Sequence, residues 1–250
     1  MSPHDWDATT YDRISGPIQA NSLTVLERLE LRGDETVLDA GCGSGGVTEA
    51  LLQRLPRGRV IAVDGSPAMI EAASRRLGDR AQLIVGDLCE LDLGGRVLDA
   101  VISTAVFHWI ADHERLFARL HANLRPGGRL VAQCGGDGNV PELMAATASV
   151  GRREPFARFL EGFSPWNYQG PRETERRLLA AGFEHVHTSL ATAPQPYEDL
   201  GQWLGSNALG AHLLRLPEEL RAGYVEAVLD AHGPDPRTTY IRLNIDAIAT

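Results

Sequence analysis

The sequence predicts an α/β protein with a Rossmann-like, doubly wound and mostly parallel sheet of seven strands, the last of them antiparallel. Three observations predict this fold: short β-branched and apolar runs alternate with segments of helical spacing, a glycine-rich turn follows the first run, and no repeat or linker divides the 250 residues. Alternating strands and helices give a parallel sheet covered on both faces. Right-handed crossovers then bring the strand ends and their loops to one edge, where ligands bind.

The first half of the chain supplies five of these strands. They are expected at residues 36–40, 59–66, 81–88 and 98–105, with a fifth after the turn at Pro126-Gly127-Gly128. The connecting helices are expected at 47–55, at 67–78 and from about residue 112. Asp112 supports the start of the third helix, because it offers a polar cap ahead of an acidic first turn.

The second half shows fewer regular patterns. Its expected elements are a helix at 173–183, a strand at 185–188, a helix at 216–233 and a strand at 238–249. Between Pro141 and Pro171, aromatic residues are mixed with prolines and glycines, which predicts a helical and aromatic insertion over the carboxyl edge of the sheet. The single domain, 1–250, is therefore divided into an N-terminal helical cap at 1–30, a cofactor-binding core at 36–135, a substrate-side insertion at 136–172 and a C-terminal part at 173–250 that completes the sheet.

The charge and composition exclude several partners. A net charge of -9 and a pI near 5.4 argue against nucleic acid, because binding its backbone needs clustered cations. No apolar run reaches the ~18 residues of a membrane span, and the N-terminus lacks the basic and apolar stretches of a signal peptide. The cysteines, Cys42, Cys89 and Cys134, fit no metal-ligand spacing, so no metal is expected. These features predict a cytoplasmic protein that binds neither nucleic acid nor membrane.

The chain contains no lysine, so its basic side chains other than histidine are all arginine. This composition excludes Schiff-base chemistry, lysine general bases and the phosphate-loop lysine of nucleoside triphosphatases. It also excludes the lysine-dependent short-chain type of oxidoreductase.

The stretch VLDAGCGSGG, residues 37–46, fits two different cofactor-binding loops. Read as Gly41-x-Gly43-x-x-Gly46, it matches the dinucleotide fingerprint; read with Asp39 and glycines 41, 43 and 45, it matches the loop that holds S-adenosylmethionine. A dinucleotide brings a pyrophosphate to the loop, and the Asp39 carboxylate would oppose that anion. S-adenosylmethionine brings an ammonium and a sulfonium, which a carboxylate attracts directly or through water. Asp39 therefore favours S-adenosylmethionine.

Two more carboxylates follow the next strands. Asp64 lies about 20 residues beyond the glycine loop, where an acidic side chain hydrogen-bonds ribose hydroxyls in either kind of cofactor. Asp87 follows the third expected strand and either accepts a hydrogen bond from the adenine amino group or serves as a turn residue.

Five motifs, LDAGCGSGG, AVDGS, VGDL, ISTAVFHW and LRPGGRL, resemble the successive motifs of class I S-adenosylmethionine-dependent methyltransferases, over about residues 5–135. The segments WDATTYDRIS, VFHWIADHERLFARLHANLRPGG and LLRLPEEL are similar to the trans-aconitate methyltransferase family, which extends the resemblance to most of the chain. FHW also resembles carboxyl methyltransferases acting on farnesoic-type acids. Both groups methylate carboxylates.

This resemblance implies a set of contacts. On the cofactor side they are Tyr11, Asp39, Gly41, Cys42, Gly43, Asp64, Gly65, Met69, Asp87, Leu88 and Thr104. On the acceptor side they are His108, Trp109, Trp166 and Tyr168. His108 would donate a hydrogen bond to an acceptor oxygen or act as a base, and a structural histidine at a helix entrance is the alternative.

The implied reaction is methylation of a small-molecule carboxylate, either trans-aconitate-like or more apolar. A carboxylate is ionised at neutral pH and needs no base, so catalysis would rest on alignment and exclusion of water. A polyanionic acid calls for several arginines. The candidates are Arg13, Arg153, Arg158, Arg172 and Arg242. The alternatives are a malonyl-carrier-protein carboxyl methyltransferase, another small-molecule O- or C-methyltransferase, a non-catalytic cofactor-binding module and an NAD-dependent oxidoreductase.

Overall fold

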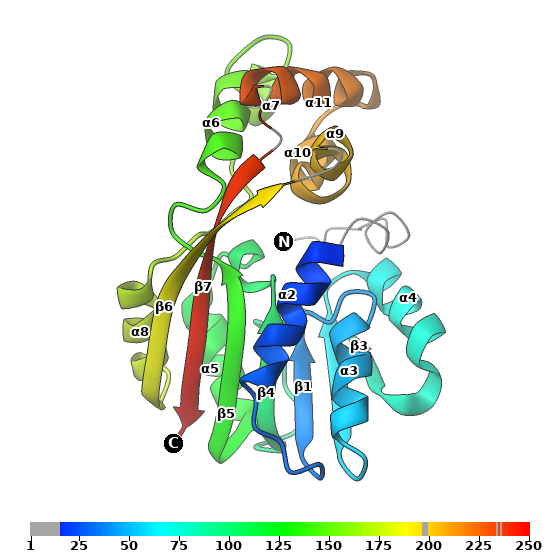
Figure 1. The fold of residues 1–250 in the computed structure, drawn as a ribbon, viewed down its shortest axis with the longest axis vertical. Coiled ribbons are helices and arrows are strands. Elements are labelled where there is room, and N and C mark those ends of the chain that lie inside the picture. The colour runs from blue at the N-terminus through cyan, green and yellow to red at the C-terminus, as the bar shows by residue number, and fades with distance from the viewer. Residues whose placement is uncertain (1–15, 197–199, 234, 236) are drawn as a thin grey trace.

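A computed structural model describes residues 16–196, 200–233, 235 and 237–250 and shows a seven-stranded sheet with the order β3-β2-β1-β4-β5-β7-β6 (Figure 1). The strands are β1 Thr36–Ala40, β2 Arg59–Asp64, β3 Gln82–Val85, β4 Leu98–Thr104, β5 Leu124–Gly135, β6 Phe183–Pro196 and β7 Arg237–Ala249. The first five are parallel, and β7 is antiparallel to both of its neighbours. The predicted fold class is confirmed. Successive strands are added to the sheet outward from β1 in one direction and, from β4 on, in the other. Sheets of this kind bind ligands at the point between β1 and β4 where this change occurs.

Two strands differ in length from the sequence prediction. β3 ends at Val85. Gly86 still donates its N–H to the Asp64 carbonyl at 2.9 Å, and Asp87 then turns the chain by accepting from the Cys89 N–H at 2.8 Å. β6 is far longer than the expected 185–188, because β7 offers it an antiparallel partner from Phe183 to Pro196, interrupted only by a register shift between Glu184 and His187. Both partner strands are separated from them by helices in the sequence, so local patterning did not reveal these bounds.

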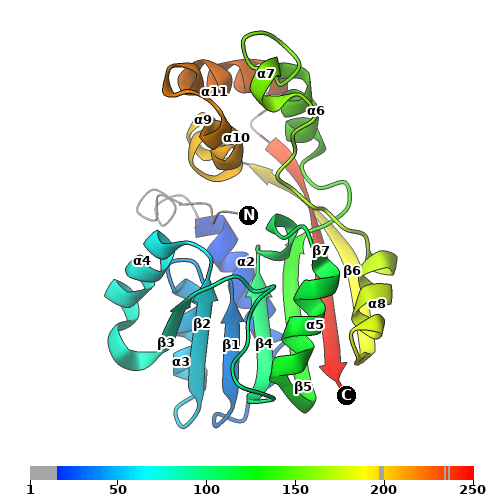
Figure 2. The same cartoon turned by 180° about the vertical axis from the view of Figure 1, so that it is seen from behind.

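Helices cover both faces of the sheet. On one face lie α2 Gly16–Glu27, α3 Gly46–Arg54 and α4 Pro67–Leu77 (Figure 1), and on the other α5 His113–Asn123 and α8 Pro171–Ala180 (Figure 2). Asp112 caps α5, because its carboxylate accepts from the Arg115 N–H at 2.9 Å. In the described part of the chain, no helix combines the length and apolar character needed to cross a membrane.

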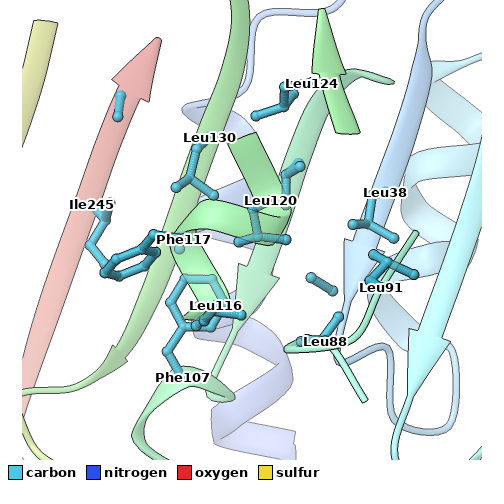
Figure 3. Close-up of a cluster of buried hydrophobic side chains, with 14 of the residues drawn as sticks. Leu38, Leu88, Leu91, Phe107, Leu116, Phe117, Leu120, Leu124, Leu130 and Ile245 are labelled. Carbon is cyan, nitrogen blue, oxygen red and sulfur yellow. The ribbon is translucent and has the colours of Figure 1, made fainter. Parts of the chain in front are cut away.

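The core beneath α5 joins distant parts of the chain. Phe107, Leu116, Phe117 and Leu120 pack toward the side chains of β5 and β7, and Phe107 meets Phe117 edge-on at 5.9 Å between ring centroids (Figure 3). No helix connects β3 to β4; the irregular segment 86–97 instead places Leu88 and Leu91 on this core. The carboxyl ends of the strands are thereby fixed by packing on both faces.

The described part of the expected 1–30 cap lies against the sheet. Val25, Leu26 and Leu29 are buried with residues of β1, β4 and α3. α2 is therefore a covering helix of the sheet, and residues 1–15, which include Tyr11 and Arg13, lie outside the described residues.

A second core lies beyond the carboxyl edge of the sheet, in a helical layer formed by two separate segments (Figure 1). Its helices are α6 Pro141–Val150, α7 Ala157–Leu160, α9 Leu200–Trp203, α10 Gly210–Arg215 and α11 Glu218–His232. The expected division assigned 173–250 to the sheet, whereas residues 200–232 belong to this layer. The reason is that α6 and α11 pack on each other, burying Val150 with Tyr224 and Val228.

Candidate functional site

A cavity of about 680 Å³ lies where the carboxyl edge of the sheet meets the helical layer. One side is formed by the loops after β1, β2, β3 and β4, and the other by residues of 163–168, 208–215 and the start of β7. The lining includes twelve residues that the sequence predicted for cofactor and acceptor: Gly41, Gly43, Asp64, Gly65, Met69, Asp87, Leu88, Thr104, His108, Trp109, Trp166 and Tyr168. The two predicted sets therefore meet in one space.

The glycine loop is shaped by a positive-φ backbone geometry that favours glycine. Gly41 has φ +84°, and a Cβ there would lie 2.2 Å from Cγ2 of Val106 in the loop after β4. Gly43 has φ +54°, and a Cβ there would have no protein atom within 4 Å. Gly41 lets two loops of the site approach each other, whereas Gly43 leaves its side of the loop open to the cavity.

Asp39 lies behind this loop and does not line the cavity. Its side chain is 1% exposed, and its Oδ2 accepts a 2.6 Å hydrogen bond from the Thr48 hydroxyl. The pKa of Asp39 is raised to about 7: burial is the main cause, the Thr48 bond opposes the rise, and the nearby Asp64 carboxylate adds to it. The carboxylate can thus act on a cation in the cavity through its field. Cys42, also predicted, is buried, and its N–H donates to the Val63 carbonyl.

Asp64 lines the cavity and connects two loops. Its Oδ2 accepts from the Gly43 N–H and its Oδ1 from the Ser66 N–H, both at 2.9 Å. Burial raises the pKa of Asp64, and the two backbone donors oppose that rise. The two oxygens are held at the mouth of the loop, where each can still accept from a hydroxyl because a carboxylate has about four lone-pair sites.

An apolar strip adjoins Asp64. It is made by Met69 and Leu88, both buried, and by Val85, which is 50% exposed. The sequence prediction missed Val85 because it was assigned to the interior of a longer third strand. Asp87 has the turn role given above, and it lines the cavity as well. The strip and the carboxylate form a slot suited to a flat base.

His108 lies in a short 3-10 turn, Phe107–Trp109, after β4. Its Nδ1 accepts the Gly135 N–H at 3.2 Å, and a backbone N–H can only donate, so the neutral ring carries its proton on Nε2. Burial lowers the pKa of His108 to about 3, with smaller contributions from His113 and the Arg242 charge. Of the roles left open by the sequence, this geometry argues against the base, whereas a proton on Nε2 is compatible with both the hydrogen-bond donor and the structural histidine.

Aromatic rings surround His108. Trp109 and Tyr168 lie with ring centroids 5.0 and 5.6 Å from it, and Tyr168 stacks on Trp166 at 6.1 Å with an interplanar angle of 9°. Phe163, also in the lining, was not among the predicted acceptor residues. The rings come from the loop after β4 and from 163–168, so they form a wall only in the folded chain.

Two arginines reach the cavity. Arg242, at the start of the part of β7 that pairs with β5, was among the sequence candidates, and Arg215, at the end of α10, was not. Arg153, Arg158 and Arg172 do not line it, and Arg13 lies outside the described residues. Within the ranges that the structure describes, no group of three or more His, Cys, Asp or Glu residues could hold a metal ion.

Comparison with known proteins agrees with this geometry. The Methyltransferase domain family matches residues 38–132. An uncharacterised methyltransferase of Schizosaccharomyces pombe, C70.08c, is 30% identical over 82% of this chain and 82% of its own length. The chain belongs to the S-adenosylmethionine-dependent methyltransferases. Family membership resolves the choice left by the glycine spacing and excludes the nicotinamide alternative.

Two further similarities describe this methyltransferase. A trans-aconitate 2-methyltransferase of Acidovorax sp. (strain JS42) is 28% identical over 90% of this chain and 87% of its own. The YcgJ protein of Bacillus subtilis has the same fold, with a TM-score of 0.64, 19% identity and coverage of 92% of this chain and 98% of its own. The match thus includes the sheet and the helical layer of the methyltransferase.

Proposed function

We propose that this methyltransferase transfers a methyl group from S-adenosylmethionine to the carboxylate of a small molecule in the cavity described above. The observation that carries the proposal is the continuity of that cavity. It runs from Asp64 and the open side of Gly43 to the neutral donor His108 and the guanidinium of Arg242. A nucleoside and an anionic acceptor would therefore share one cavity.

The residues present fit the cofactor. Gly43 leaves room for close approach of a ligand, and the Asp64 oxygens are placed to accept from ribose hydroxyls. Met69 and Leu88 would pack on the adenine, and the buried Asp39 carboxylate would attract the ammonium group. When bound, S-adenosylmethionine supplies a methyl group on a positively charged sulfur, whose bond to carbon breaks as the acceptor oxygen bonds to that carbon.

The acceptor side suits an oxygen that is already ionised. A carboxylate needs no proton removed at neutral pH, and His108 has no basic nitrogen to offer, because Nδ1 is occupied and Nε2 carries the proton. His108 would orient the acceptor with a hydrogen bond while Trp109, Trp166 and Tyr168 exclude water. Alignment is then the main catalytic contribution of the protein.

The relatives named trans-aconitate 2-methyltransferase support an acid as acceptor. The lining also includes several aromatic rings beside its two arginines. We therefore propose the carboxylate as the reacting group and include both trans-aconitate and flat apolar acids as candidates.

A turnover screen tests the proposal. The protein would be incubated with S-adenosylmethionine and a panel of acids containing trans-aconitate, trans-cinnamate and isoprenoid acids, with the matching amides as controls. Formation of S-adenosylhomocysteine and a methyl ester with an acid, but not with its amide, is the expected result. Binding of S-adenosylmethionine without turnover of any acid would contradict the proposed acceptor class and favour a non-catalytic binding module.

A further inference from the structure

We propose that Arg242 anchors the anionic group of the acceptor, and that Asn244 and Arg28, which lie outside the cavity, position it through Gln133. This inference rests on the proposed function and names the residue that would select acids over neutral molecules. It is based on a chain of polar side chains, here called the polar ribbon: Asp246, Arg28, Asn244, Gln133 and Arg242.

The polar ribbon is continuous from the sheet face under α2 to the cavity. Arg28 pairs with Asp246 at 2.6 Å and donates to Asn244 Oδ1 at 3.0 Å. Gln133 Nε2 donates to the same Asn244 oxygen at 2.8 Å, and Gln133 Oε1 accepts from Arg242 Nη1 at 3.3 Å. Gln133 and Arg242 line the cavity, whereas Arg28, Asn244 and Asp246 do not.

The orientation of both amide side chains in the polar ribbon is fixed by the hydrogen-bonding capacity of their arginine partners. Arg28 and Arg242 have only donors, so Asn244 and Gln133 must turn their oxygens toward them. Gln133 then presents its NH₂ group to Asn244, as observed. The ribbon therefore has one arrangement that satisfies these contacts, and this arrangement sets the position of the Arg242 guanidinium.

Strand register places the ribbon on one face of the sheet. Gln133 is paired with Asn244, and Gly135 with Arg242, in the antiparallel ladder of β5 and β7. Side chains of alternate residues share a face, so Arg242, Asn244 and Asp246 are aligned, while Leu243 and Ile245 face the core under α5. Arg28 follows α2 and reaches this line from the covering helix.

Arg242 lies beside the proposed donor His108. Gly135 is the register partner of Arg242, and its N–H is the group bonded to His108 Nδ1. The Arg242 guanidinium also lies over the Tyr240 ring, 4.9 Å from its centroid. A guanidinium has five N–H donors in a planar fork that matches a carboxylate, so the bond to Gln133 is compatible with binding an acceptor carboxylate.

The second arginine of the lining has different surroundings. Arg215 donates its Nε to the Phe159 carbonyl at 3.1 Å and lies over the Phe163 ring, 4.4 Å from its centroid. Its contacts belong to the helical layer, which contains both Phe159 and Phe163, whereas Arg242 is held by the polar ribbon. We therefore assign the anion anchor to Arg242.

Equilibrium binding tests the anchor. With the enzyme saturated in S-adenosylhomocysteine, calorimetry would measure the Kd of trans-cinnamate, trans-aconitate and the neutral analogue cinnamamide. We expect Arg242→Met to raise the Kd of an acid by about tenfold or more, the scale of a charge-assisted hydrogen bond, and to leave cinnamamide within about twofold. Arg129→Met, which removes an exposed pair with Glu30, is the control and should change neither Kd.

A matched pair of variants tests the positioning role outside the cavity. Asn244→Ala removes the oxygen shared by Arg28 and Gln133, and we expect the Kd of the acid to rise about threefold to tenfold. Asn244→Asp keeps an oxygen for both donors, so it should stay within about twofold of the wild type. Unchanged affinity for S-adenosylhomocysteine would show that each variant is folded.

Each result of these binding experiments tests one part of the proposal. Unchanged acid binding in Arg242→Met, or no acid binding by a wild-type protein that binds S-adenosylhomocysteine, overturns the anion anchor. Equal behaviour of Asn244→Ala and Asn244→Asp overturns the positioning role. Failure of the wild type to bind S-adenosylhomocysteine would instead remove the proposed function, and this inference with it.

Discussion

The two halves of the cavity are formed in different ways. The half proposed for the cofactor comes from loops that directly follow strands. Its geometry is set largely by backbone: positive φ at Gly41 and Gly43, and two N–H groups that hold the Asp64 carboxylate. The acceptor half combines side chains from four distant segments, 104–110, 163–168, 208–215 and 240–242. Short motifs can therefore identify the first half, whereas the second exists only after long-range packing.

This difference has an energetic consequence. A change in the glycine loop alters backbone that both the fold and the cofactor need, so stability and binding should fall together. A change in the acceptor half removes one side chain from a wall that many others support. We expect the four variants below to separate these two kinds of dependence, in order of decreasing effect.

The largest effect is expected for Gly41→Ala. A Cβ there would clash with Val106 and would add side-chain strain at φ +84°. Together these should lower the free energy of unfolding by about 3 kcal/mol and reduce cofactor affinity more than a hundredfold. Urea unfolding and calorimetry with S-adenosylhomocysteine measure the two quantities.

Gly78→Ala is the control for backbone strain alone. Gly78 has φ +57°, but a Cβ there would meet no atom within 4 Å, and it lies outside the cavity lining. The Gly78→Ala substitution should lower the free energy of unfolding by about 1–2 kcal/mol and leave cofactor affinity unchanged. If Gly41→Ala and Gly78→Ala bound S-adenosylhomocysteine equally well, the close contact between Gly41 and Val106 would not be needed for cofactor binding.

Asp64→Ala comes next. It removes the acceptor for the N–H groups of Gly43 and Ser66 and for the ribose hydroxyls, so we expect the Kd of S-adenosylhomocysteine to rise about a hundredfold. Asp87→Ala is the comparison, because this exposed carboxylate makes one described backbone bond, and its loss should cost about tenfold or less. A larger loss at Asp87 than at Asp64 would reverse the proposed assignment of ribose binding.

His108→Ala tests the acceptor half. We expect kcat/KM for an acid to fall about tenfold to a hundredfold, as for a lost hydrogen bond to a charged group, while the Kd of S-adenosylhomocysteine stays within about twofold. Because burial lowers the pKa of His108 to about 3, its ring stays neutral, and wild-type kcat/KM should show no step from histidine titration near pH 6.5. Full turnover in the variant would make His108 structural.

The smallest effect is expected for Asp39→Asn, about a tenfold rise in cofactor Kd at pH 8, because Asp39 does not line the cavity. Burial raises the pKa of Asp39 to about 7, and only the ionised form attracts an ammonium. Wild-type affinity should therefore weaken as pH falls from 8 to 6, whereas Asp39→Asn should lack this change. A pH-dependent loss of equal size in both proteins would exclude Asp39 as its source.

The same ionisation affects stability. Since the pKa of Asp39 is higher in the folded than in the unfolded chain, the folded state binds more protons between about pH 4 and 7, and the ligand-free protein loses stability as pH rises through that range. Asp39→Asn should remove this loss and unfold at higher urea concentration than the wild type at pH 8. Lower stability of the variant would contradict the raised pKa.

The sequence by itself determined the sheet, the glycine loop and the family. Strand and helix patterns such as Thr36–Ala40 and Pro67–Leu77 are local, and Gly41 and Gly43 mark a turn whose positive φ angles favour glycine. Tertiary structure alone decided that Asp39 lies behind the loop, that residues 200–232 join the insertion in one helical layer, and that Arg242 reaches the cavity while Arg153 and Arg158 do not. The physical reason is the separation, along the sequence, of the residues that interact. Backbone geometry is specified by residues a few positions apart. Burial, side-chain register and the meeting of distant segments depend on contacts that no local pattern contains.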